Sequence, residues 1–286
     1  MANLNNTFLD YNKVISLNKT RQKQLTSARK AVEKAIKSYF KLDKRLGVHG
    51  FFIQGSFKMK TMIVKKNNTY DVDLGVYFSR KPNIEPRTLQ QHVLKAVRNK
   101  TQGGTTYKQK CIRLNYKGDF NIDLPVYYLY ENSNKTYLAT KDGWEESDPR
   151  GLMSWYLESG GKEEQLRRII KYLKAWADNH KNKMPSGIAL SVWATQKYSP
   201  DDRDDIALYN TLLDIKRSFS WIWNVKCINP ASPNDNLLEK LNSNQKERFK
   251  SELKILISDL DIAIECDNIE DGMKRLKSHF GKRLVT

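Results

Sequence analysis

The chain has few cysteines, and their arrangement excludes a disulfide framework or a structural zinc site. Its 286 residues contain only Cys111, Cys227 and Cys266, which are odd in number, far apart and without C-x-x-C spacing. The four histidines show no metal-ligand spacing with them. We therefore expect buried, reduced thiols and a cytoplasmic protein.

Long hydrophobic runs are also missing. No stretch of 18 apolar residues occurs, and the first residues do not resemble a signal peptide, so we expect no membrane span and no secretion. Internal repeats and low-complexity tracts are absent as well. With 39% hydrophobic and 10% aromatic residues, the chain can form a core. Its length suits one bilobed unit or two closely packed domains.

Acidic residues are scarce in the first hundred positions, where 21 Lys and Arg face 6 Asp and Glu, a net charge of +15. The whole chain carries +18, whereas the last 86 residues carry −1. A surface of this charge attracts nucleoside triphosphates, and it could hold RNA or DNA through phosphate contacts. The alternative is general solubility charge on solvated helix faces.

Periodicity predicts an α+β chain that becomes helical after residue 150. The segment 19–45 is predicted to form a long amphipathic helix, and 86–100 a second helix. The predicted strands are 50–54, 71–78, 107–116 and 120–129. From Leu152 onward the pattern is helical, which suggests domains at 1–150 and 151–286. The aspartates at 201, 202, 204 and 205 are predicted to mark an exposed loop or a helix start, and the segment 229–236 is predicted to be a loop.

Two aspartates separated by one residue occur in the run Tyr70-Asp71-Val72-Asp73-Leu74. In a strand, residues i and i+2 project from one face, so both carboxylates point one way while Val72 and Leu74 face the core. Adjacent carboxylates repel each other unless a cation or a shared proton relieves them, and their oxygens suit Mg²⁺. The alternative is an exposed strand with two solvated aspartates, because D-x-D is a short pattern.

Two neighbouring segments favour the metal site. Upstream, an apolar run ends in Gly55-Ser56, which predicts a tight turn where the backbone can approach a phosphate. Lys58 and Lys60 follow and have the right charge for a triphosphate. Downstream, Asp123 occupies the polar side of another alternating strand. Each segment is weak evidence alone, and their order makes a far more specific pattern.

This order of Gly55-Ser56, fourteen further residues, Asp71-Val72-Asp73 and a later Asp123 resembles the polymerase-β-like nucleotidyltransferases. Within that superfamily it resembles the bacterial CD-NTases, relatives of cyclic GMP-AMP synthase and oligoadenylate synthase. The resemblance covers about residues 25–265. Its softer features are Trp144, Ser147-Asp148-Pro149, Trp155, Pro185-Ser186, Asn229-Pro230 and Asn236-Leu237-Leu238. Nothing in the sequence could build the zinc-binding insertion of cyclic GMP-AMP synthase.

The resemblance implies a fold and a set of site residues. The fold would be a nucleotidyltransferase core, a mixed sheet with flanking helices, plus a C-terminal helical lobe, with the active site in the cleft between the lobes. The implied catalytic and metal-binding residues, for two Mg²⁺ ions or alternatively Mn²⁺, are Asp71, Asp73 and Asp123. The implied nucleotide-binding residues are Gly55, Ser56, Lys174 and Ser186.

Two of these residues also have simpler interpretations. Lys174 lies at the edge of an apolar helix face, where a lysine usually packs its stem and keeps its amine in water. Lys171, one turn earlier, is the alternative phosphate ligand. Ser186 could instead cap a helix that begins near Gly187.

The implied function is Mg-dependent conversion of NTPs into a cyclic di- or trinucleotide second messenger in anti-phage (CBASS-type) signalling. The enzyme would be a cytoplasmic monomer, with RNA or DNA as an activator on its basic N-terminal surface and a separate effector protein that binds the product. Two alternatives stay open: an RNA-dependent transferase that extends a 3′ end, and a non-catalytic RNA-binding protein on the same fold.

Overall fold

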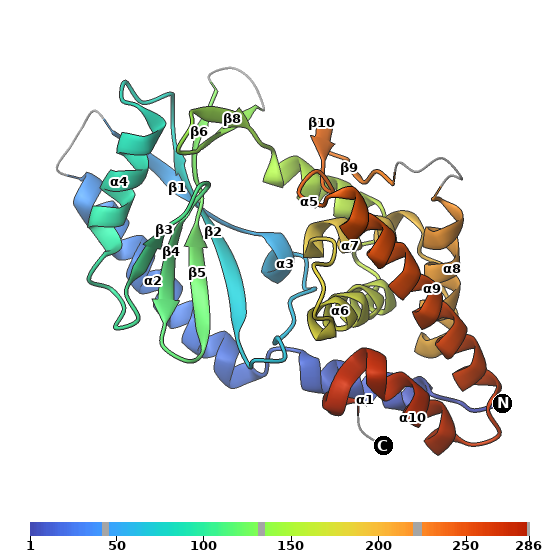
Figure 1. The fold of residues 1–286 in the computed structure, drawn as a ribbon. Coiled ribbons are helices and arrows are strands. Elements are labelled where there is room, and N and C mark those ends of the chain that lie inside the picture. Colours follow the sequence, from blue (N-terminus) through green and yellow to red (C-terminus); the bar gives the residue numbers. More distant parts are fainter. Residues whose placement is uncertain (42–45, 131–134, 220–224, 285–286) are drawn as a thin grey trace. The chain divides into compact units, whose positions relative to one another are not determined.

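The computed structural model describes residues 1–41, 46–130, 135–219 and 225–284, and the chain divides into two compact units (Figure 1). The sheet unit comprises Leu17–Lys58 and Asn67–Met153. The helical unit comprises Met1–Ser16, Met59–Lys66 and Ser154–Thr286. The predicted α+β fold, a mixed sheet with flanking helices followed by a helical C-terminal part, is confirmed.

Among the described residues, eight strands form one mixed sheet in the sheet unit. Their order is β3-β4-β5-β2-β6-β7-β8, and β1 pairs with β2. β2 runs parallel to β5 and β6, and the other pairs are antiparallel. The strands are β1 (Val48–Gln54), β2 (Tyr70–Phe78), β3 (Thr105–Tyr107), β4 (Ile112–Tyr116), β5 (Phe120–Leu124), β6 (Val126–Leu129), β7 (Thr136–Ala139) and β8 (Trp144–Glu146).

The predicted strand 120–129 is divided at Pro125. Proline has no N–H to continue the ladder, so β5 and β6 lie on either side of it. The Pro125 carbonyl accepts a hydrogen bond from the Val76 N–H at 2.9 Å. β2 therefore pairs with β5 along its first half and with β6 along its second half. The predicted strand 107–116 likewise consists of two strands, β3 and β4, which pair antiparallel.

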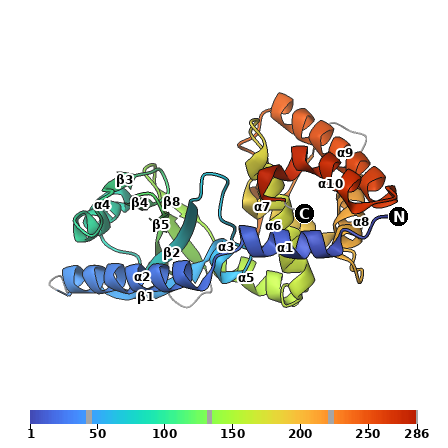
Figure 2. The ribbon, with the colours of Figure 1, turned by 90° about the horizontal axis from the view of Figure 1, so that it is seen from below.

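Helices α2 (Lys19–Phe40) and α4 (Pro86–Val97) contact each other and pack on the sheet. Figure 2 shows α2 along its length. Asn18 caps α2 by accepting a hydrogen bond from the Arg21 N–H. The buried residues of α2 are Leu25, Val32, Ile36 and Phe40, which form the apolar side of the predicted amphipathic helix. Residues 42–45, the end of the predicted 19–45 segment, lie outside the described residues.

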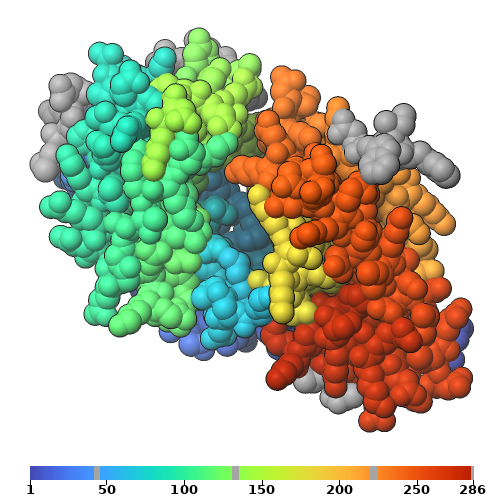
Figure 3. Space-filling view, viewed as in Figure 1, coloured from blue at the N-terminus to red at the C-terminus, as the bar shows by residue number. Residues whose placement is uncertain are grey.

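The helical unit contains a helix that is buried on all sides, α7 (Gly187–Gln196), in which every residue from Ala189 to Thr195 is buried. A helix of this kind lies in a core. On the face shown in Figure 3, α9 and α10 supply much of the orange and red surface of this unit. The remaining helices are α1 (Asn5–Ile15), α5 (Pro149–Glu158), α6 (Glu164–Asn179), α8 (Asp204–Arg217), α9 (Ser243–Glu265), α10 (Ile269–Phe280) and the 3₁₀ helix η1 (Gly281–Arg283).

Aromatic side chains hold α1 in the helical unit. Phe8 and Tyr11 are fully buried. Both rings contact Tyr172 of α6 and Phe280 of α10, with ring centroids 5.1 to 6.2 Å apart. Aromatic rings bury a large apolar area, so these contacts attach α1 firmly to the C-terminal helices.

The structural division differs from the predicted domains 1–150 and 151–286 in two segments. Met1–Ser16 and Met59–Lys66 precede residue 150, yet both belong to the helical unit. They also contact each other, because the Val64 N–H donates to the Ile15 carbonyl at 2.8 Å. Contacts of this kind join distant segments, so they leave no mark on local periodicity.

The segment 229–236, predicted to be a loop, forms most of a small hairpin instead. Its strands are β9 (Ile228–Asn229) and β10 (Ser232–Asn236), which pair antiparallel. Polar residues such as Asn and Ser are typical of loops, and the short antiparallel pairing overrides that preference.

Asp204 and Asp205 start α8, as the helix-start alternative predicted, and both are buried rather than exposed. Their exposed fractions are 1% and 0%. Arg168 pairs with Asp204 at 2.6 Å and Arg203 pairs with Asp205 at 2.5 Å, so each buried carboxylate has a cationic partner.

The remaining predictions from composition concern the burial of the cysteines and the absence of a membrane span. Cys227 is buried as predicted, whereas Cys111 and Cys266 are partly exposed. Throughout the described ranges, no helix combines the length and the apolar character needed to cross a membrane.

Candidate active site

Asp71 and Asp73 lie on β2, and Asp123 lies on the neighbouring strand β5. The parallel register pairs Asp73 with Asp123 and Asp71 with Asn121. Residues paired in this way project from the same face of a sheet, so all three carboxylates share one face. The Asn121 side-chain amide donates to Asp71 Oδ1 at 2.8 Å. The structure thus brings together the three predicted aspartates.

Asp73 is buried beside two other carboxylates. Its pKa is raised from 3.8 to about 7, first by burial and then by the carboxylates of Asp123 and Asp71, against the opposing effects of Arg113 and Lys108. A buried carboxyl beside two like charges is stabilised in its ionised form by a nearby cation. The surroundings of Asp73 therefore favour the binding of positive charge.

Arg113 on β4 is a residue of this site that was not predicted from the sequence. Its guanidinium holds Asp123 through two parallel hydrogen bonds, Nε to Oδ1 and Nη2 to Oδ2, both 2.7 Å long. Nη2 also lies 3.3 Å from Asp71 Oδ1, and Lys108 Nζ lies 3.7 Å from Asp123 Oδ2. The sequence did contain a signal for Arg113, because a tight hairpin turn at Gly118 places it directly opposite Asp123.

The Gly55-Ser56 turn lies beside Asp73. β1 pairs with β2 so that Gln54 is opposite Asp73, and the chain then turns into the short helix α3 (Gly55–Lys58). Gly55 has a φ of +63°, and a Cβ at this position would clash with Asp73 Oδ2. Both the backbone conformation and the close approach therefore require glycine.

Gln54, which precedes this turn, is held by two tyrosines. Its Nε2 donates to the Tyr127 hydroxyl at 3.1 Å, and the Tyr77 hydroxyl donates to its Oε1 at 3.2 Å. The two tyrosine rings stack with their centroids 4.7 Å apart. These contacts fix the end of β1 and hence the start of the Gly55-Ser56 turn.

Lys174 and Ser186 lie in the helical unit, whereas the aspartates and the glycine turn lie in the sheet unit. Lys174 on α6 donates from Nζ to the Thr61 carbonyl at 3.2 Å and to Thr61 Oγ1 at 2.9 Å. Ser186 caps α7 by accepting a hydrogen bond from the Ala189 N–H at 3.2 Å. A Cβ on Gly187 would lie 3.4 Å from Lys174 Cε, so the stem of Lys174 runs along the start of α7.

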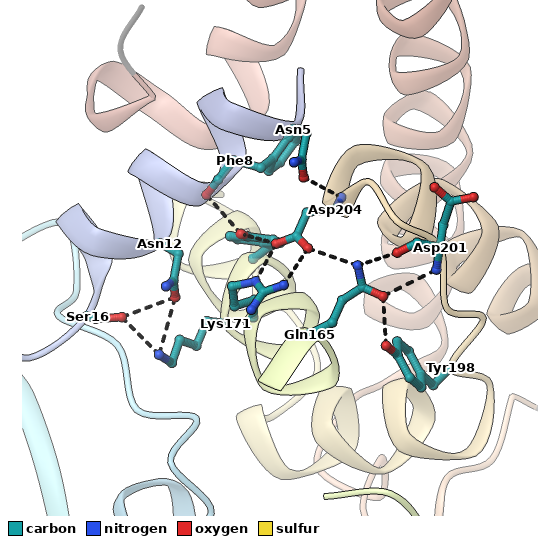
Figure 4. Close-up of polar contacts among 11 residues, drawn as sticks. Asn5, Phe8, Asn12, Ser16, Gln165, Lys171, Tyr198, Asp201 and Asp204 are labelled. Atoms are coloured by element: carbon teal, nitrogen blue, oxygen red, sulfur yellow. Dashed lines mark hydrogen bonds and ion pairs between the residues drawn. The ribbon is translucent and has the colours of Figure 1, made fainter. Parts of the chain in front are cut away.

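Lys171, the alternative phosphate ligand, binds groups of α1 within the helical unit (Figure 4). Its Nζ donates to Ser16 Oγ at 2.9 Å and to Asn12 Oδ1 at 3.3 Å. Its pKa is lowered to about 8 by burial and then by the charges of Arg168 and Arg167. We therefore assign Lys171 to the packing of α1 on α6.

Asp204 is the centre of a second cluster of contacts in Figure 4. Its carboxylate accepts two hydrogen bonds from Arg168, at 2.6 and 2.8 Å, one from Tyr172 at 2.7 Å and one from Gln165 at 3.0 Å. Its N–H donates to Asn5 Oδ1 at 2.8 Å. Burial acts to raise the pKa of Asp204, but these hydrogen bonds hold it below its usual range. The cluster joins α1, α6 and α8.

The three aspartates supply the hard oxygen ligands that Mg²⁺ and Mn²⁺ prefer. In the part of the chain that the structure describes, however, no group of three His, Cys, Asp or Glu side chains is arranged as a metal site. At the aspartates, Arg113 holds Asp123 and approaches Asp71. The donor types thus fit a divalent cation, while their present arrangement is that of an ion pair.

Two family models match the chain. The nucleotidyltransferase domain of DncV-like cyclic GMP-AMP synthases matches residues 49–127, and the C-terminal domain of cyclic GMP-AMP synthase matches residues 163–286. The first range contains the Gly55-Ser56 turn and the three aspartates. The second contains Lys174 and Ser186.

Two curated relatives are similar in sequence. A cyclic GMP-AMP synthase of Escherichia albertii is 28% identical over 183 residues, which cover 58% of this chain and 41% of that enzyme. A c-di-GMP synthase of Roseivirga ehrenbergii is 22% identical over 278 residues, which cover 82% of this chain and 72% of that enzyme. The match to the first relative therefore spans less than half of its length.

Solved structures share the fold. A variant of the Vibrio cholerae di-nucleotide cyclase DncV, in complex with ATP and GTP, aligns with a TM-score of 0.84 at 18% identity, over 100% of this chain and 98% of its own. The Bradyrhizobium diazoefficiens CD-NTase CdnG, in complex with GTP, aligns with a TM-score of 0.84 at 15% identity, over 98% and 96%. These solved structures show that the fold is shared along the whole length. Because its residues 49–127 and 163–286 both match models of this family, the chain belongs to the DncV-like nucleotidyltransferases, within the bacterial CD-NTases.

Proposed function

We propose that this nucleotidyltransferase joins NTPs into a cyclic di- or trinucleotide second messenger. The observation that carries the proposal is the register of β2 with β5, which places Asp71, Asp73 and Asp123 on one face of the sheet beside Gly55. The names of the two relatives, a cyclic GMP-AMP synthase and a c-di-GMP synthase, support a cyclic product. Similar structures in complex with ATP and GTP, or with a linear pppA(3′,5′)pG intermediate, support NTP substrates.

The three aspartates are the proposed catalytic residues. Asp71, Asp73 and Asp123 would hold two Mg²⁺ ions, or alternatively Mn²⁺, and the bound ions would acidify the attacking ribose hydroxyl and neutralise the departing pyrophosphate. Asp123 assists the removal of the proton from that hydroxyl. Asp71 and Asp73 supply the negative charge that keeps the cations at the site.

The phosphate-binding residues align the substrate. Gly55 and Ser56 hold the β- and γ-phosphates so that the α-phosphate lies in line with the attacking hydroxyl, and such positioning supplies much of the rate. Lys174 and Ser186 are proposed to bind the triphosphate as well. Formation of a ring requires the linear intermediate to turn round and react again in the same pocket.

Labelled NTPs and Mg²⁺ test the proposal with the purified protein. We expect small products that resist phosphatase, since a ring has no terminal phosphate, and we expect Asp73→Asn to abolish them. Asp119→Asn, a matched change of an exposed aspartate in the same sheet unit, should leave synthesis intact. Extension of added RNA alone would instead establish the 3′-end transferase, and nucleotide binding without turnover would establish a non-catalytic protein.

A row of lysines on α2 supports a nucleic-acid activator as part of the proposal. Six exposed lysines, here called the lysine stripe, are Lys19, Lys23, Lys30, Lys34, Lys37 and Lys41. At 3.6 residues per turn they fall on one side of the helix, opposite its buried apolar face. Such a row of charges can follow an RNA or DNA phosphate backbone.

The product implies a separate effector protein that binds it. We propose that the pair serves anti-phage (CBASS-type) signalling in the cytoplasm, with the synthase acting as a monomer. Mass spectrometry of the product from an NTP mixture, with and without structured RNA or DNA, would identify the bases, the ring size and the linkage.

A further inference from the structure

Arg113 occupies a position at the three aspartates that the proposed reaction does not explain. It lies on β4 directly opposite Asp123 in the antiparallel ladder, so the backbone itself directs its side chain to that carboxylate. Both oxygens of Asp123 accept a hydrogen bond from the guanidinium at 2.7 Å. The side chains of Arg113 and Asp123 are only 21% and 13% exposed, so little water screens the pair.

The guanidinium also reaches a second carboxylate. Arg113 Nη2 lies 3.3 Å from Asp71 Oδ1, which also accepts a hydrogen bond from the side-chain amide of Asn121 at 2.8 Å. Lys108 adds a second positive charge 3.7 Å from Asp123 Oδ2. Arg113 and Lys108 thus place two positive charges beside the three carboxylates, and these charges reduce the mutual repulsion of the carboxylates.

A divalent cation would need the same carboxylate oxygens. Its positive charge would also repel a guanidinium that stays on Asp123 and beside Asp71. Because Arg113 is a long side chain anchored on an adjacent strand, rotation about its own side-chain bonds can release the carboxylates without any change in the strand register.

We propose that Arg113 is the internal counter-ion of the aspartates and that a divalent cation binds only after the guanidinium has moved off Asp123. Arg113 is thus a positioning residue: it holds Asp123 in place while no metal is bound, and it sets a threshold for metal binding. The inference rests on the proposed role of the aspartates as metal ligands.

Calorimetric titration with Mn²⁺ alone, on the full chain without nucleotide, tests the competition. For Arg113→Gln we expect a dissociation constant about tenfold lower than for the wild type, a typical coupling between two competing ligands. The same variant should melt at a lower temperature in EDTA, because three carboxylates lose their main counter-ion. Arg80→Gln removes the same charge from an exposed position of the sheet unit, and it should change neither quantity.

Arg113→Lys provides a second test that does not depend on how well Arg113→Gln folds. It keeps the charge and loses the two-pronged contact, so Mn²⁺ should bind with an affinity between those of the wild type and Arg113→Gln. The Mg²⁺ concentration for half-maximal synthesis should fall in the same order. Mn²⁺ affinity in either Arg113 variant that equals that of Arg80→Gln, or is weaker, would overturn the proposal.

The outcomes also separate this inference from the proposed function. Tighter Mn²⁺ binding in Arg113→Gln, together with a wild type that forms no cyclic product, would leave the inference standing and remove the function. A cyclic product that Asp73→Asn abolishes, together with unchanged Mn²⁺ affinity in the Arg113 variants, would support the proposed function and overturn the inference about Arg113.

Discussion

Gly55 combines an unusual backbone conformation with a close contact to a proposed catalytic side chain. Gly55→Ala would place a methyl group against Asp73 Oδ2 at a φ of +63°. We expect a loss of about 2–3 kcal/mol in the free energy of unfolding and loss of product, because strain and steric displacement add. Denaturant unfolding and product assays measure the two effects.

Gly118 is the matched control for this change. Its φ is +85°, and a Cβ there would meet nothing within 4 Å. Gly118→Ala should therefore cost only the left-handed backbone penalty, about 1 kcal/mol, and should retain synthesis. Equal losses in the two variants would show that the contact of Gly55 with Asp73 is unimportant.

Asp73 should make the metal-free protein less stable as the pH rises. Its pKa is raised from 3.8 to about 7 in the fold, so the folded state holds the proton more tightly than the unfolded state between these values. Stability therefore falls as the pH rises through this window, and the loss is complete above pH 7. Asp73→Asn removes the loss and should be more stable than the wild type at pH 8 by on the order of 4 kcal/mol. Denaturant unfolding in EDTA measures this, and identical pH slopes would contradict it.

At the scale of elements, the Asp204 cluster joins three helices of the helical unit. Asp204 is buried and accepts two hydrogen bonds from Arg168, so Arg168→Met leaves a buried carboxylate without its cation. We expect the free energy of unfolding to fall by about 3 kcal/mol. Arg217→Met breaks the exposed pair with Asp214 in the same unit and should change it by less than about 0.5 kcal/mol. Similar values for both would mean that the cluster does not stabilise the helix packing.

Lys171 gives the α1–α6 contact a pH dependence of the opposite sign. Its pKa is lowered to about 8 from 10.5, so between these values the unfolded state holds a proton that the folded state has lost. The contribution of Lys171 to stability therefore improves as the pH rises through that window. Relative to Lys171→Met, the wild type should gain about 2 kcal/mol between pH 7 and pH 9.5. Lys162→Met, at an exposed position, is the control. If the wild type gains as much stability relative to Lys162→Met as relative to Lys171→Met, the assignment is contradicted.

Sequence periodicity correctly predicted the elements whose structure depends mainly on their own residues. The amphipathic α2 and the strand β2 follow the periodicity of their own residues. The division of two predicted strands and the β9–β10 hairpin depend on pairing with partners, as when β2 changes its neighbour from β5 to β6 at Pro125. Partner strands are chosen by tertiary contacts, which periodicity does not record.

For the whole molecule, the charge of +18 raises the question of whether the lysine stripe or the general charge binds nucleic acid. A triple reversal in the stripe (K30E, K34E and K37E) should weaken binding to duplex RNA or DNA about tenfold. It should also reduce the slope of log affinity against log salt concentration by about 3. Titration with a fluorescent duplex at several salt concentrations measures both effects.

A triple reversal in the helical unit at exposed lysines (K240E, K254E and K277E) gives the same net charge. Equal weakening by the two triple variants would show that general charge, rather than the stripe, holds the duplex. If structured RNA and DNA leave synthesis by the wild type unchanged, the proposed activation fails whatever the affinity.

The division into two units is also a property of the whole molecule. Local patterns placed a boundary near residue 150, and the contact-based boundary lies at Met153. They could not place Met1–Ser16 and Met59–Lys66 with the C-terminal helices, because that assignment depends on contacts such as Phe8 with Tyr172.

The sequence by itself determined the chemistry available to this protein: three aspartates on polar strand faces, a Gly-Ser turn and an excess of basic residues. Side-chain alternation is a local property, so the orientation of Asp71 with Asp73 follows from it directly. Only the tertiary structure decided which strands are neighbours. That choice brought Asp123 to Asp73 and placed Gly55 against the same carboxylate. These pairings join distant segments through packing, so they appeared only in the fold, whereas the contact of Arg113 with Asp123 follows from the short hairpin between β4 and β5.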